Sequence, residues 1–476
     1  MHKNIFRKAV SLLIILITLL SSSCREEVLQ NETQKPHSTS DEASESTDGS
    51  TTSADTFLQT DAVTSTETDI PKENEVTAVP IINIITDDKE GITSKSEYKS
   101  AKMSIVCDEE TGFSNCDVSD INIRIRGRGN ASWNQFPKKS YRIKLDESIS
   151  LFGMKKDKDW LLVSNYADKS LMRNIVAHNT AKKLDNLEYT PTHIAVELYL
   201  NGEYMGVYGF AEKIEFGGGK LEYTADGETV DTSYLLEVGW DYNDDMVYGM
   251  NYFDTDYILR IVIKEPEFTK RYTPSGNYII NYMKEAENAV VSLNGYEKYI
   301  DVDSLIDYLI ITEFTNNTEN VFYRSCYMYK PSGEKLKFGP AWDFDMAFGN
   351  YSYDIKSYDG WCSIDNKFTH LGNDSVSWYS FLFKDPKFTE KFVLRWDEVK
   401  DELLQTALNT VDIQAKALAS AQVRNFELWD IMDKKIGAGN VDHRTYNTYE
   451  LQVEYLRKFI NDRYNWIEEN ISEFRL

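Results

Sequence analysis

Residues 121–145 read INIRIRGRGNASWNQFPKKSYRIKL, and this stretch decides the fold of the first half of the chain. Isoleucine alternates with asparagine or arginine over residues 121–125, and apolar residues alternate with basic ones over residues 141–145. Alternation with a period of two is typical of a half-buried strand. A strand, a glycine-containing loop and a second strand together predict a hairpin.

The surrounding sequence predicts more strands and one helix. Further strands are expected over residues 80–86, 194–200, 205–210 and 234–238, and Asn201-Gly202 is a strong hairpin turn between the second and third of these. Leu171, Ile175 and His178 share a helical face, with Asp168 as the expected N-cap. The first half is therefore predicted to be a mainly antiparallel sheet with one substantial helix.

The second half of the chain is predicted to be mainly helical around one hairpin. Asp303 is expected to cap a helix that reaches residue 312, and the strands 322–329 and 335–338 flank a turn and lead into Trp342-Asp343-Phe344-Asp345. The pattern is helical from about Phe388 onward. The last helix is expected to bury one face, made of Leu456, Ile460, Arg463 and Ile467. The predicted fold class is α+β.

Composition narrows the class of protein. The chain has 476 residues and a formal net charge of −25, with 41% hydrophobic and 13% aromatic residues. So many aromatic residues provide a large packed core and exclude a wholly disordered chain. The excess of acidic residues argues against nucleic acid as a partner, because phosphate binding needs an excess of Lys and Arg.

The first 24 residues have the pattern of a bacterial lipoprotein signal. Lys3, Arg7 and Lys8 precede an apolar run that ends shortly before Cys24, the residue expected to carry the lipid. Ser21 stands where this pattern prefers leucine, so an ordinary signal peptide and an uncleaved anchor helix remain alternatives. The sequence predicts an extracytoplasmic protein on the surface of a bacterial cell, bound to the membrane through its lipid anchor only.

Residues 25–77 are rich in Ser, Thr, Asp and Glu and are predicted to be a solvated tether. Four later cysteines can pair outside the cytoplasm. Cys107 and Cys116 flank a glycine-containing turn, so that either a hairpin-closing disulfide or two free thiols fits the spacing. The pairing of Cys326 and Cys362 is left open.

Two features of the sequence bear on chemistry. The first is the turn at Gly127 and Gly129, followed by Lys139 on a strand whose apolar residues share its parity. Glycines allow backbone amides to approach phosphate oxygens, and a strand lysine neutralises them. A tight hairpin with exposed basic residues is the structural alternative.

The second feature is Asp343 and Asp345, which directly follow the predicted hairpin. Carboxylates at a strand end suit Mg²⁺ together with substrate phosphates, and a pair of surface carboxylates is the alternative. The order glycine loop, strand lysine, helix, polar loop, hairpin and aspartate is that of a protein kinase. The standard kinase motifs HRD and GxGxxG are absent, so a kinase here is atypical.

Four stretches resemble the spore coat protein H (CotH) kinase family of atypical secreted kinases. They are residues 124–145, 151–174 (LFGMKKDKDWLLVSNYADKSLMRN), 196–215 (VELYLNGEYMGVYGFAEKIE) and 325–350 (SCYMYKPSGEKLKFGPAWDFDMAFGN). The resemblance implies a bilobal kinase-like fold, with a sheet-rich N-lobe over residues 78–230 and a mainly helical C-lobe over residues 231–476. It also implies transfer of the ATP γ-phosphate, with Mg²⁺, to Ser or Thr of a secreted or surface protein.

The resemblance also implies roles for single residues. Asp343, with Asp345, is the implied metal ligand, and Lys139 contacts phosphates, with Lys144 as the fallback. The nucleotide site is expected to include Gly127, Gly129, Ser132 and, near the hinge, Glu212.

The chain departs from the family in its catalytic loop. The family usually carries an aspartate in an Asn-x-Asp loop before the hairpin, whereas this chain has Asn317-Thr318-Glu319-Asn320. An alignment without a gap puts Asn320 in that position, and one inserted residue puts Glu319 there. A surface adhesin or binding module on a kinase-like scaffold is therefore the main alternative function, and carbohydrate hydrolysis through paired carboxylates is a weaker one.

Overall fold

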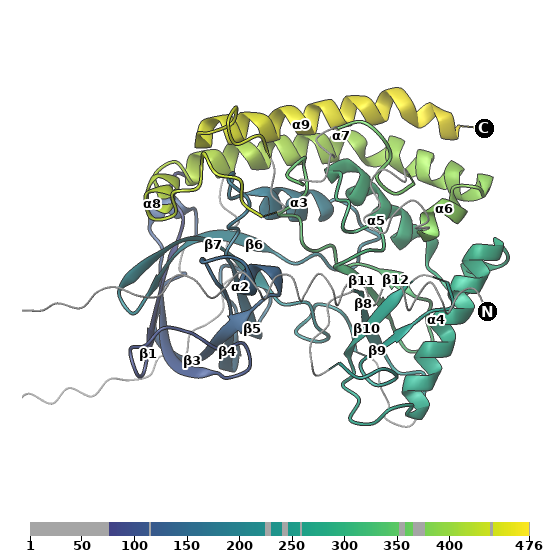
Figure 1. The fold of residues 1–476 in the computed structure, drawn as a ribbon, viewed down its shortest axis with the longest axis horizontal. Helices are drawn as coiled ribbons and strands as arrows, with labels where there is room; N and C mark the ends of the chain where they lie inside the picture. Colours follow the sequence, from purple (N-terminus) through teal and green to yellow (C-terminus); the bar gives the residue numbers. More distant parts are fainter. Residues whose placement is uncertain are drawn as a thin grey trace, which may run out of the picture. The chain divides into compact units, whose positions relative to one another are not determined.

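The structure is a computed structural model that describes residues 76–475, except 114–115, 224–229, 240–245, 258, 352–357, 365–376 and 438–440. The predicted signal segment with Cys24, and all but the last two residues of the predicted tether, lie outside these described residues. The fold is α+β, as predicted, with a barrel, a second sheet and a set of helices (Figure 1).

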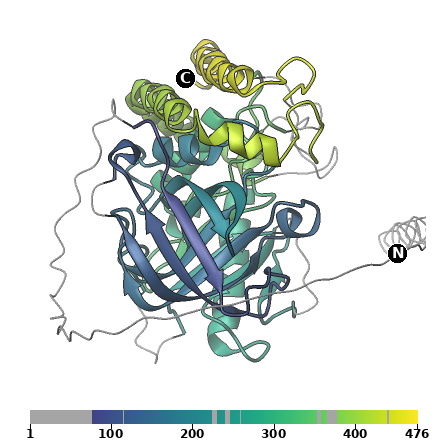
Figure 2. The same cartoon turned by 90° about the vertical axis from the view of Figure 1, so that its left-hand side faces the viewer.

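The first half of the chain forms a closed seven-stranded barrel in the order β1-β2-β3-β4-β5-β7-β6. The strands are β1 (Ile81–Thr86), β2 (Lys99–Val106), β3 (Val118–Arg128), β4 (Ser140–Ile149), β5 (Asp157–Val163), β6 (His193–Leu200) and β7 (Glu203–Glu212). Neighbouring strands are antiparallel except for β1 and β6, whose parallel pairing closes the barrel (Figure 2). The sequence predicted β1, β3, β4, β6 and β7 as parts of an antiparallel sheet, whereas β2 was not predicted. Closure of the barrel was not predicted either, because only long-range pairing produces it.

The alternating residues of the predicted hairpin line the barrel core as expected. Ile123, Ile125, Tyr141, Ile143 and Leu145 are all buried. They pack with apolar side chains of the other barrel strands in one cluster. The hairpin loop also contains a short helix, α2 (Ala131–Asn134), which the sequence did not predict.

A second antiparallel sheet follows in the order β12-β11-β8-β10-β9. Its strands are β8 (Tyr234–Val238), β9 (Tyr252–Asp254), β10 (Arg260–Glu265), β11 (Cys326–Lys330) and β12 (Lys337–Phe338). Both strands of the predicted hairpin before Asp343 are shorter than expected. Residues 320–325 form turns and bends instead of the start of β11, and these turns include residues of the site.

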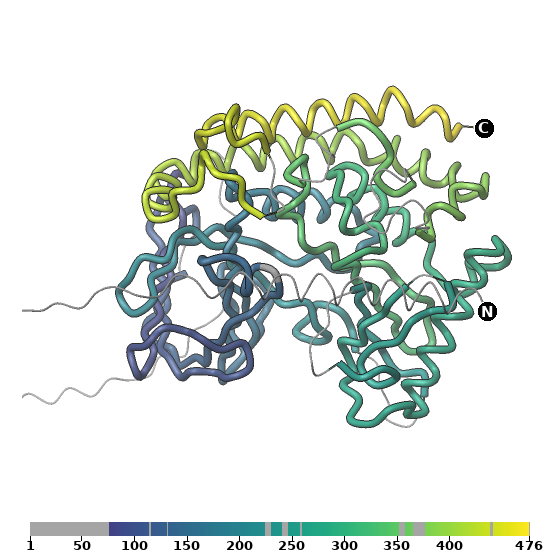
Figure 3. The backbone as a smooth tube through the Cα atoms, in the orientation of Figure 1, coloured from purple at the N-terminus to yellow at the C-terminus, as the bar shows by residue number. Residues whose placement is uncertain are grey.

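Helices cover the second sheet and pack on one another (Figures 1 and 3). They are α3 (Arg173–Ala181), α4 (Pro274–Ser292), α5 (Val302–Thr315), α6 (Trp378–Leu382), α7 (Pro386–Ala417), α8 (Ala421–Leu428) and α9 (Tyr449–Asn470), with the short 3-10 turns η1 (Glu109–Thr111), η2 (Tyr296–Lys298) and η4 (Ile471–Phe474). The predicted apolar face of α9 is buried. Within the described part of the chain, no helix is both long and apolar enough to cross a membrane.

Two predicted helix caps are wrong by a few residues. Helix α5 begins two residues earlier than expected, because Asp301 rather than Asp303 accepts a hydrogen bond from Ser304 N at 2.8 Å. Asp168 lies before α3 but outside its N-cap position, and its Oδ2 accepts from the amide of Arg173 at 2.8 Å.

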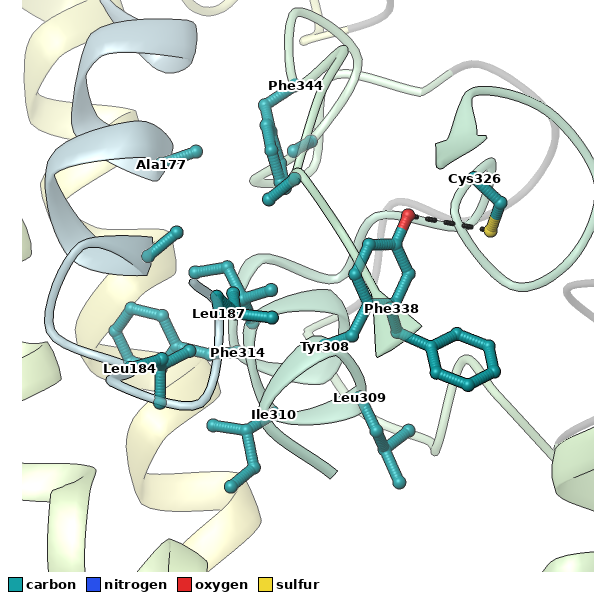
Figure 4. Packing of buried hydrophobic residues seen from close by; sticks show 14 of the residues in the cluster. Ala177, Leu184, Leu187, Tyr308, Leu309, Ile310, Phe314, Cys326, Phe338 and Phe344 are labelled. Carbon is teal, nitrogen blue, oxygen red and sulfur yellow. Dashed lines mark hydrogen bonds between the residues drawn. The ribbon is translucent and has the colours of Figure 1, made fainter. Parts of the chain in front are cut away.

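The largest cluster of apolar side chains joins α3, α5, α7 and α9 to the inner face of the second sheet. Figure 4 shows Ala177 of α3, Tyr308 and Phe314 of α5, and Phe344 within it. The hydroxyl of Tyr308 lies 3.5 Å from the thiol of Cys326. Phe344 therefore anchors in this core the loop that also carries Asp343.

The described cysteines divide into one pair and two single thiols. Cys107 and Cys116 form a disulfide, which confirms one of the two alternatives that the spacing allowed. Cys326 and Cys362 are free and buried.

Candidate active site

Asp343 lies in an irregular loop after β12, so Asp343 and Asp345 do not continue the alternation of a strand. Its φ of +69° lies in the left-handed region, which a non-glycine residue seldom adopts. Ser325 Oγ donates to Asp343 Oδ2 at 2.9 Å, and Asn317 Nδ2 donates to the Asp343 carbonyl at 3.0 Å. The loop after α5 and the residue before β11 therefore hold both the backbone and the carboxylate of Asp343.

The polar loop after α5 brings Asn317, Glu319 and Asn320 beside Asp343. Asn320 is fully buried, and its Oδ1 accepts from Asn317 Nδ2 at 2.9 Å. Glu319 is only half-buried, and its carboxylate acts electrostatically on Asp345. Glu319 and Asn320 are the two candidates for the position of the family's aspartate. The carboxylate of Glu319 acts on the acidic residues of the site, whereas the amide of Asn320 bonds to Asn317 of the same loop.

Acidic side chains converge on Asp345. Burial raises the pKa of the Asp345 carboxyl well above its usual range, and the carboxylates of Asp343, Glu319 and Asp168 raise it further. The guanidinium of Arg173 opposes this shift, but it is bound to Asp168 in a fully buried ion pair. The site therefore concentrates negative charge that a cation would stabilise.

Arg128, at the end of β3, is a cation of the barrel that interacts electrostatically with Asp343. Burial lowers the pKa of its guanidinium, and the carboxylate of Asp343 is the largest influence that opposes this shift. The guanidinium carbon lies 5.9 Å from the centre of the Trp342 ring. Sequence reasoning missed Arg128 because it treated the residue as part of the glycine turn, although its position on the Ile123 and Ile125 strand is visible in the sequence.

Two further charged side chains that act on Arg128 lie on the second sheet. Lys264 of β10 pairs with Glu237 of β8 at 2.7 Å. The carboxylate of Glu237 also helps to raise the pKa of Arg128, less than Asp343 and the phenol of Tyr327 do. Lys264 and Glu237 were not predicted as site residues, since neither belongs to a recognisable motif.

The predicted phosphate lysines have other partners. Lys139 donates to the carbonyl of Trp133 at 2.5 Å, and Lys144 lies 3.8 Å from Asp159 across the β4–β5 pair. The buried lysine of this stretch is Lys138, which donates to Val207 O at 2.5 Å and to Asn425 Oδ1 at 2.9 Å. The parity assigned to Lys139 is wrong because β4 begins at Ser140, so strand alternation does not extend back to residue 139.

The glycine turn is filled by its own side chains. A Cβ at Gly127 would lie 2.3 Å from the Trp133 ring, and a Cβ at Gly129, where φ is +90°, would lie 2.1 Å from Ser132 Oγ. Both glycines are therefore required by the packing of this loop. Ser132 itself is half-buried.

Glu212 lies at the end of β7, paired with Trp160 of β5. It is buried, and its Oε2 accepts from the amide of Thr192 at 2.8 Å. Its carboxylate helps to raise the pKa of the buried Tyr189 phenol. Glu212 is thus the last residue of the barrel strand β7, directly before the segment that leads to the second sheet.

The acidic residues fit a magnesium ion that is held largely by its substrate. Within the described residues, no group of three or more His, Cys, Asp and Glu side chains is arranged to hold a metal by itself. Mg²⁺ usually takes one or two carboxylates and completes its shell with water and phosphate oxygens. Asp343, with Asp345 two residues on, supplies that number of carboxylates.

The fold and the site together define an α+β protein with an acidic site that a barrel arginine faces. A family model described as CotH kinase protein matches residues 123–467, which is most of the chain. The chain therefore belongs to the CotH kinase protein family, and this membership indicates a kinase-like protein. No curated protein matches the chain.

Proposed function

We propose that this protein is an extracytoplasmic kinase that transfers the γ-phosphate of Mg-ATP to Ser or Thr of a secreted or surface protein. In this proposal the barrel acts as the N-lobe and the helical half as the C-lobe of an atypical bilobal kinase. The observation that carries the proposal is that Arg128, from the barrel, lies over the ring of Trp342, the residue before Asp343 in the loop after β12, and interacts electrostatically with Asp343. Phosphoryl transfer depends mainly on such positioned charge.

Each residue of the site has a distinct role in the proposal. Arg128 binds phosphate oxygens, for which a guanidinium is well suited. Asp343 and Asp345 hold Mg²⁺, which neutralises charge on the transferred phosphoryl group. The acceptor oxygen forms a bond to the γ-phosphorus, the bond to the β-phosphate oxygen breaks, and Glu319 takes the hydroxyl proton.

An apolar cluster supports this arrangement of the two halves. Leu161 and Ala211 of the barrel pack with Leu235 and Tyr329 of the second sheet and with Trp342. Because Trp342 is adjacent to Asp343 and its ring lies under the Arg128 guanidinium, this cluster helps to hold the two charged residues in the same region.

Radiolabel transfer tests the proposed activity. Wild-type protein incubated with γ-labelled ATP and Mg²⁺ is expected to label a Ser/Thr-rich acceptor protein, and Asp343→Asn is expected to reduce labelling at least 100-fold. Asp412→Asn, which removes a surface carboxylate paired with Arg457, is the matched control and should label normally. Equal labelling by wild type and Asp343→Asn would reject the assigned role.

A surface binding module is the second candidate function. The alignment without a gap favours it, because it puts Asn320 where the family usually has an aspartate, and an amide cannot act as a base. A ligand that binds the native state raises its stability, so Mg-ATP should raise the melting temperature of a kinase. No shift at millimolar Mg-ATP would favour the binding module instead.

Location outside the cytoplasm is part of the same proposal. The Cys107–Cys116 disulfide supports it, since such bonds persist in oxidising compartments. Attachment through a lipid on Cys24 rests on the sequence pattern. Fractionation of cells that express the wild type or Cys24→Ser tests it, and loss of the variant from the membrane fraction is the expected result.

A further inference from the structure

Two side chains of α3, one helical turn apart, bond to the backbone on either side of Asp343. Asn174 Oδ1 accepts from the amide of Phe344 at 2.8 Å. His178 Nε2 lies 3.0 Å from the carbonyl of Ala341, so this ring nitrogen is the donor. Both side chains are almost completely buried. Residues four apart share one face of a helix, so α3 presents both to the same loop.

These bonds act on a strained residue. Asp343 has a φ of +69°, and a non-glycine residue keeps such a conformation only where its surroundings fix it. Asn317 adds a third bond to this loop, at the carbonyl of Asp343 itself. The direction of the carboxylate thus depends on side chains that do not touch it.

The two α3 side chains are held in turn by the barrel. Asn174 Nδ2 donates to Asn165 Oδ1 at 3.2 Å, and the His178 ring stacks on His193 of β6 with 4.1 Å between centres. Gly209 of β7 lies against both supports. A Cβ at this glycine would be 3.3 Å from Asn165 Nδ2, which is tighter than most real Cβ contacts, and 3.5 Å from His193 Nδ1, which is an ordinary van der Waals contact.

We propose that Asn174 and His178 are positioning residues that set the Asp343 carboxylate and couple it to barrel strands β6 and β7. Two links run side by side, from Asn165 through Asn174 to Phe344 N and from His193 through His178 to Ala341 O. A Cβ added at Gly209 would press on Asn165, at the start of the first link, and would touch His193, at the start of the second. The catalytic consequence of this coupling rests on the proposed function, whereas the coupling itself does not.

Hydrogen–deuterium exchange of the ligand-free chain tests the links directly. Asn174→Ala and His178→Leu are each expected to speed exchange of the peptide that contains Phe344 by at least tenfold. His178→Gln, which keeps a donor for Ala341 O, should restore most of the protection. Thr180→Val is the matched control, because Thr180 is a buried α3 residue whose hydroxyl donates to Val176 O, within the helix itself. Equal exchange in Asn174→Ala and Thr180→Val would overturn the proposal.

A double-mutant cycle tests the coupling to the barrel. Gly209→Ala alone should also speed exchange at Phe344, and its effect should be much smaller in an Asn174→Ala/His178→Leu background, because the links are already broken. Independent, additive effects would overturn the coupling. In phosphate-transfer assays, Asn174→Ala and His178→Leu should lower kcat and leave the KM for ATP unchanged within twofold. His178→Gln should keep most of the wild-type kcat. If wild type transfers no phosphate, the proposed function fails, while the exchange experiment still decides the positioning role.

Discussion

The hydroxyl of Ser325 donates a 2.9 Å hydrogen bond to the Oδ2 atom of Asp343. Ser325 immediately precedes β11, and its own φ of +52° turns the chain toward this loop. Because the following residue, Cys326, is buried in the main core, the hydroxyl is held on a rigid support. The bond therefore fixes one orientation of the carboxylate, which is the geometry that a metal ligand requires.

Removal of this hydroxyl is expected to weaken metal use. Ser325→Ala should raise the Mg²⁺ concentration for half-maximal activity about tenfold, since a hydrogen bond to a charged group contributes about 1.5–3 kcal/mol. Ser332→Ala, at the far end of the hairpin, removes a hydroxyl bonded to Asp231 O and is the control. An unchanged Mg²⁺ requirement in Ser325→Ala would contradict this role for the bond.

Arginine rather than lysine is expected to bind the phosphates. Arg128→Ala should raise the KM for ATP by about 10- to 100-fold, because loss of a charge-assisted hydrogen bond costs roughly 1.5–3 kcal/mol. Lys139→Ala and Lys144→Ala should change this KM less than threefold, since their ammonium groups bond to Trp133 O and pair with Asp159. Steady-state kinetics of the three variants decides between the arginine and the two lysines, and a large effect of Lys139→Ala alone would restore the original prediction.

Acid should destabilise the fold through His178. Burial lowers the pKa of this histidine from 6.5 to about 3. Below pH 6.5 the unfolded chain takes up a proton that the folded chain does not, so stability is complete above pH 6.5 and is lost as the pH falls toward 3, by up to about 1.4 kcal/mol per pH unit.

The pH dependence of urea unfolding between pH 7 and 5 measures this loss. His178→Gln should flatten the curve, although His193, whose pKa burial also lowers, keeps part of the slope. His443→Gln, outside the barrel and α3, is the control. A slope that His178→Gln leaves unaltered would refute the assignment.

A buried ion pair between α5 and α9 is expected to be critical for stability. Arg463 Nη2 lies 2.6 Å from Glu313 Oε2, and both side chains are at most 1% exposed. Arg463→Met leaves the carboxylate buried without its cation and should cost about 3–5 kcal/mol in the free energy of unfolding. Arg457→Met, on the same helix, breaks an exposed pair with Asp412 and should cost at most about 1 kcal/mol. Similar losses in both variants would show that burial does not govern the cost.

The Cys107–Cys116 disulfide should stabilise the connection between β2 and β3 of the barrel. It closes a loop with a sequence separation of nine, and closure of so short a loop is worth about 2–3 kcal/mol. Dithiothreitol should therefore lower the free energy of unfolding of the wild type by this amount. The Cys107→Ser/Cys116→Ser variant should start at the lower value and should not respond to the reductant. A wild type that is indifferent to reductant would argue against the pairing.

The sequence by itself determined many of the strands and helices and the place of Asp343 after the second hairpin, whereas it did not predict β2, β9, β10, α2 or α4. Alternation over residues 121–125 and 141–145 is a local property, since successive side chains of a strand point to opposite faces. Likewise Asn201-Gly202 fixes the turn between β6 and β7 because its backbone preferences are local. Family motifs that lie close together in the chain are readable for the same reason.

Only the tertiary structure decided that the first sheet closes, and which cation faces Asp343. Closure depends on the parallel pairing of Ile82 with Leu198, residues far apart in the chain, and no local pattern encodes such a contact. The choice of Arg128 over Lys139 depends on where β4 begins and on how Trp133 fills the turn. The start of β4 and the filling of the turn are both outcomes of packing. They depend on excluded volume and on contacts between distant residues, which the alternation of apolar residues along a strand does not determine.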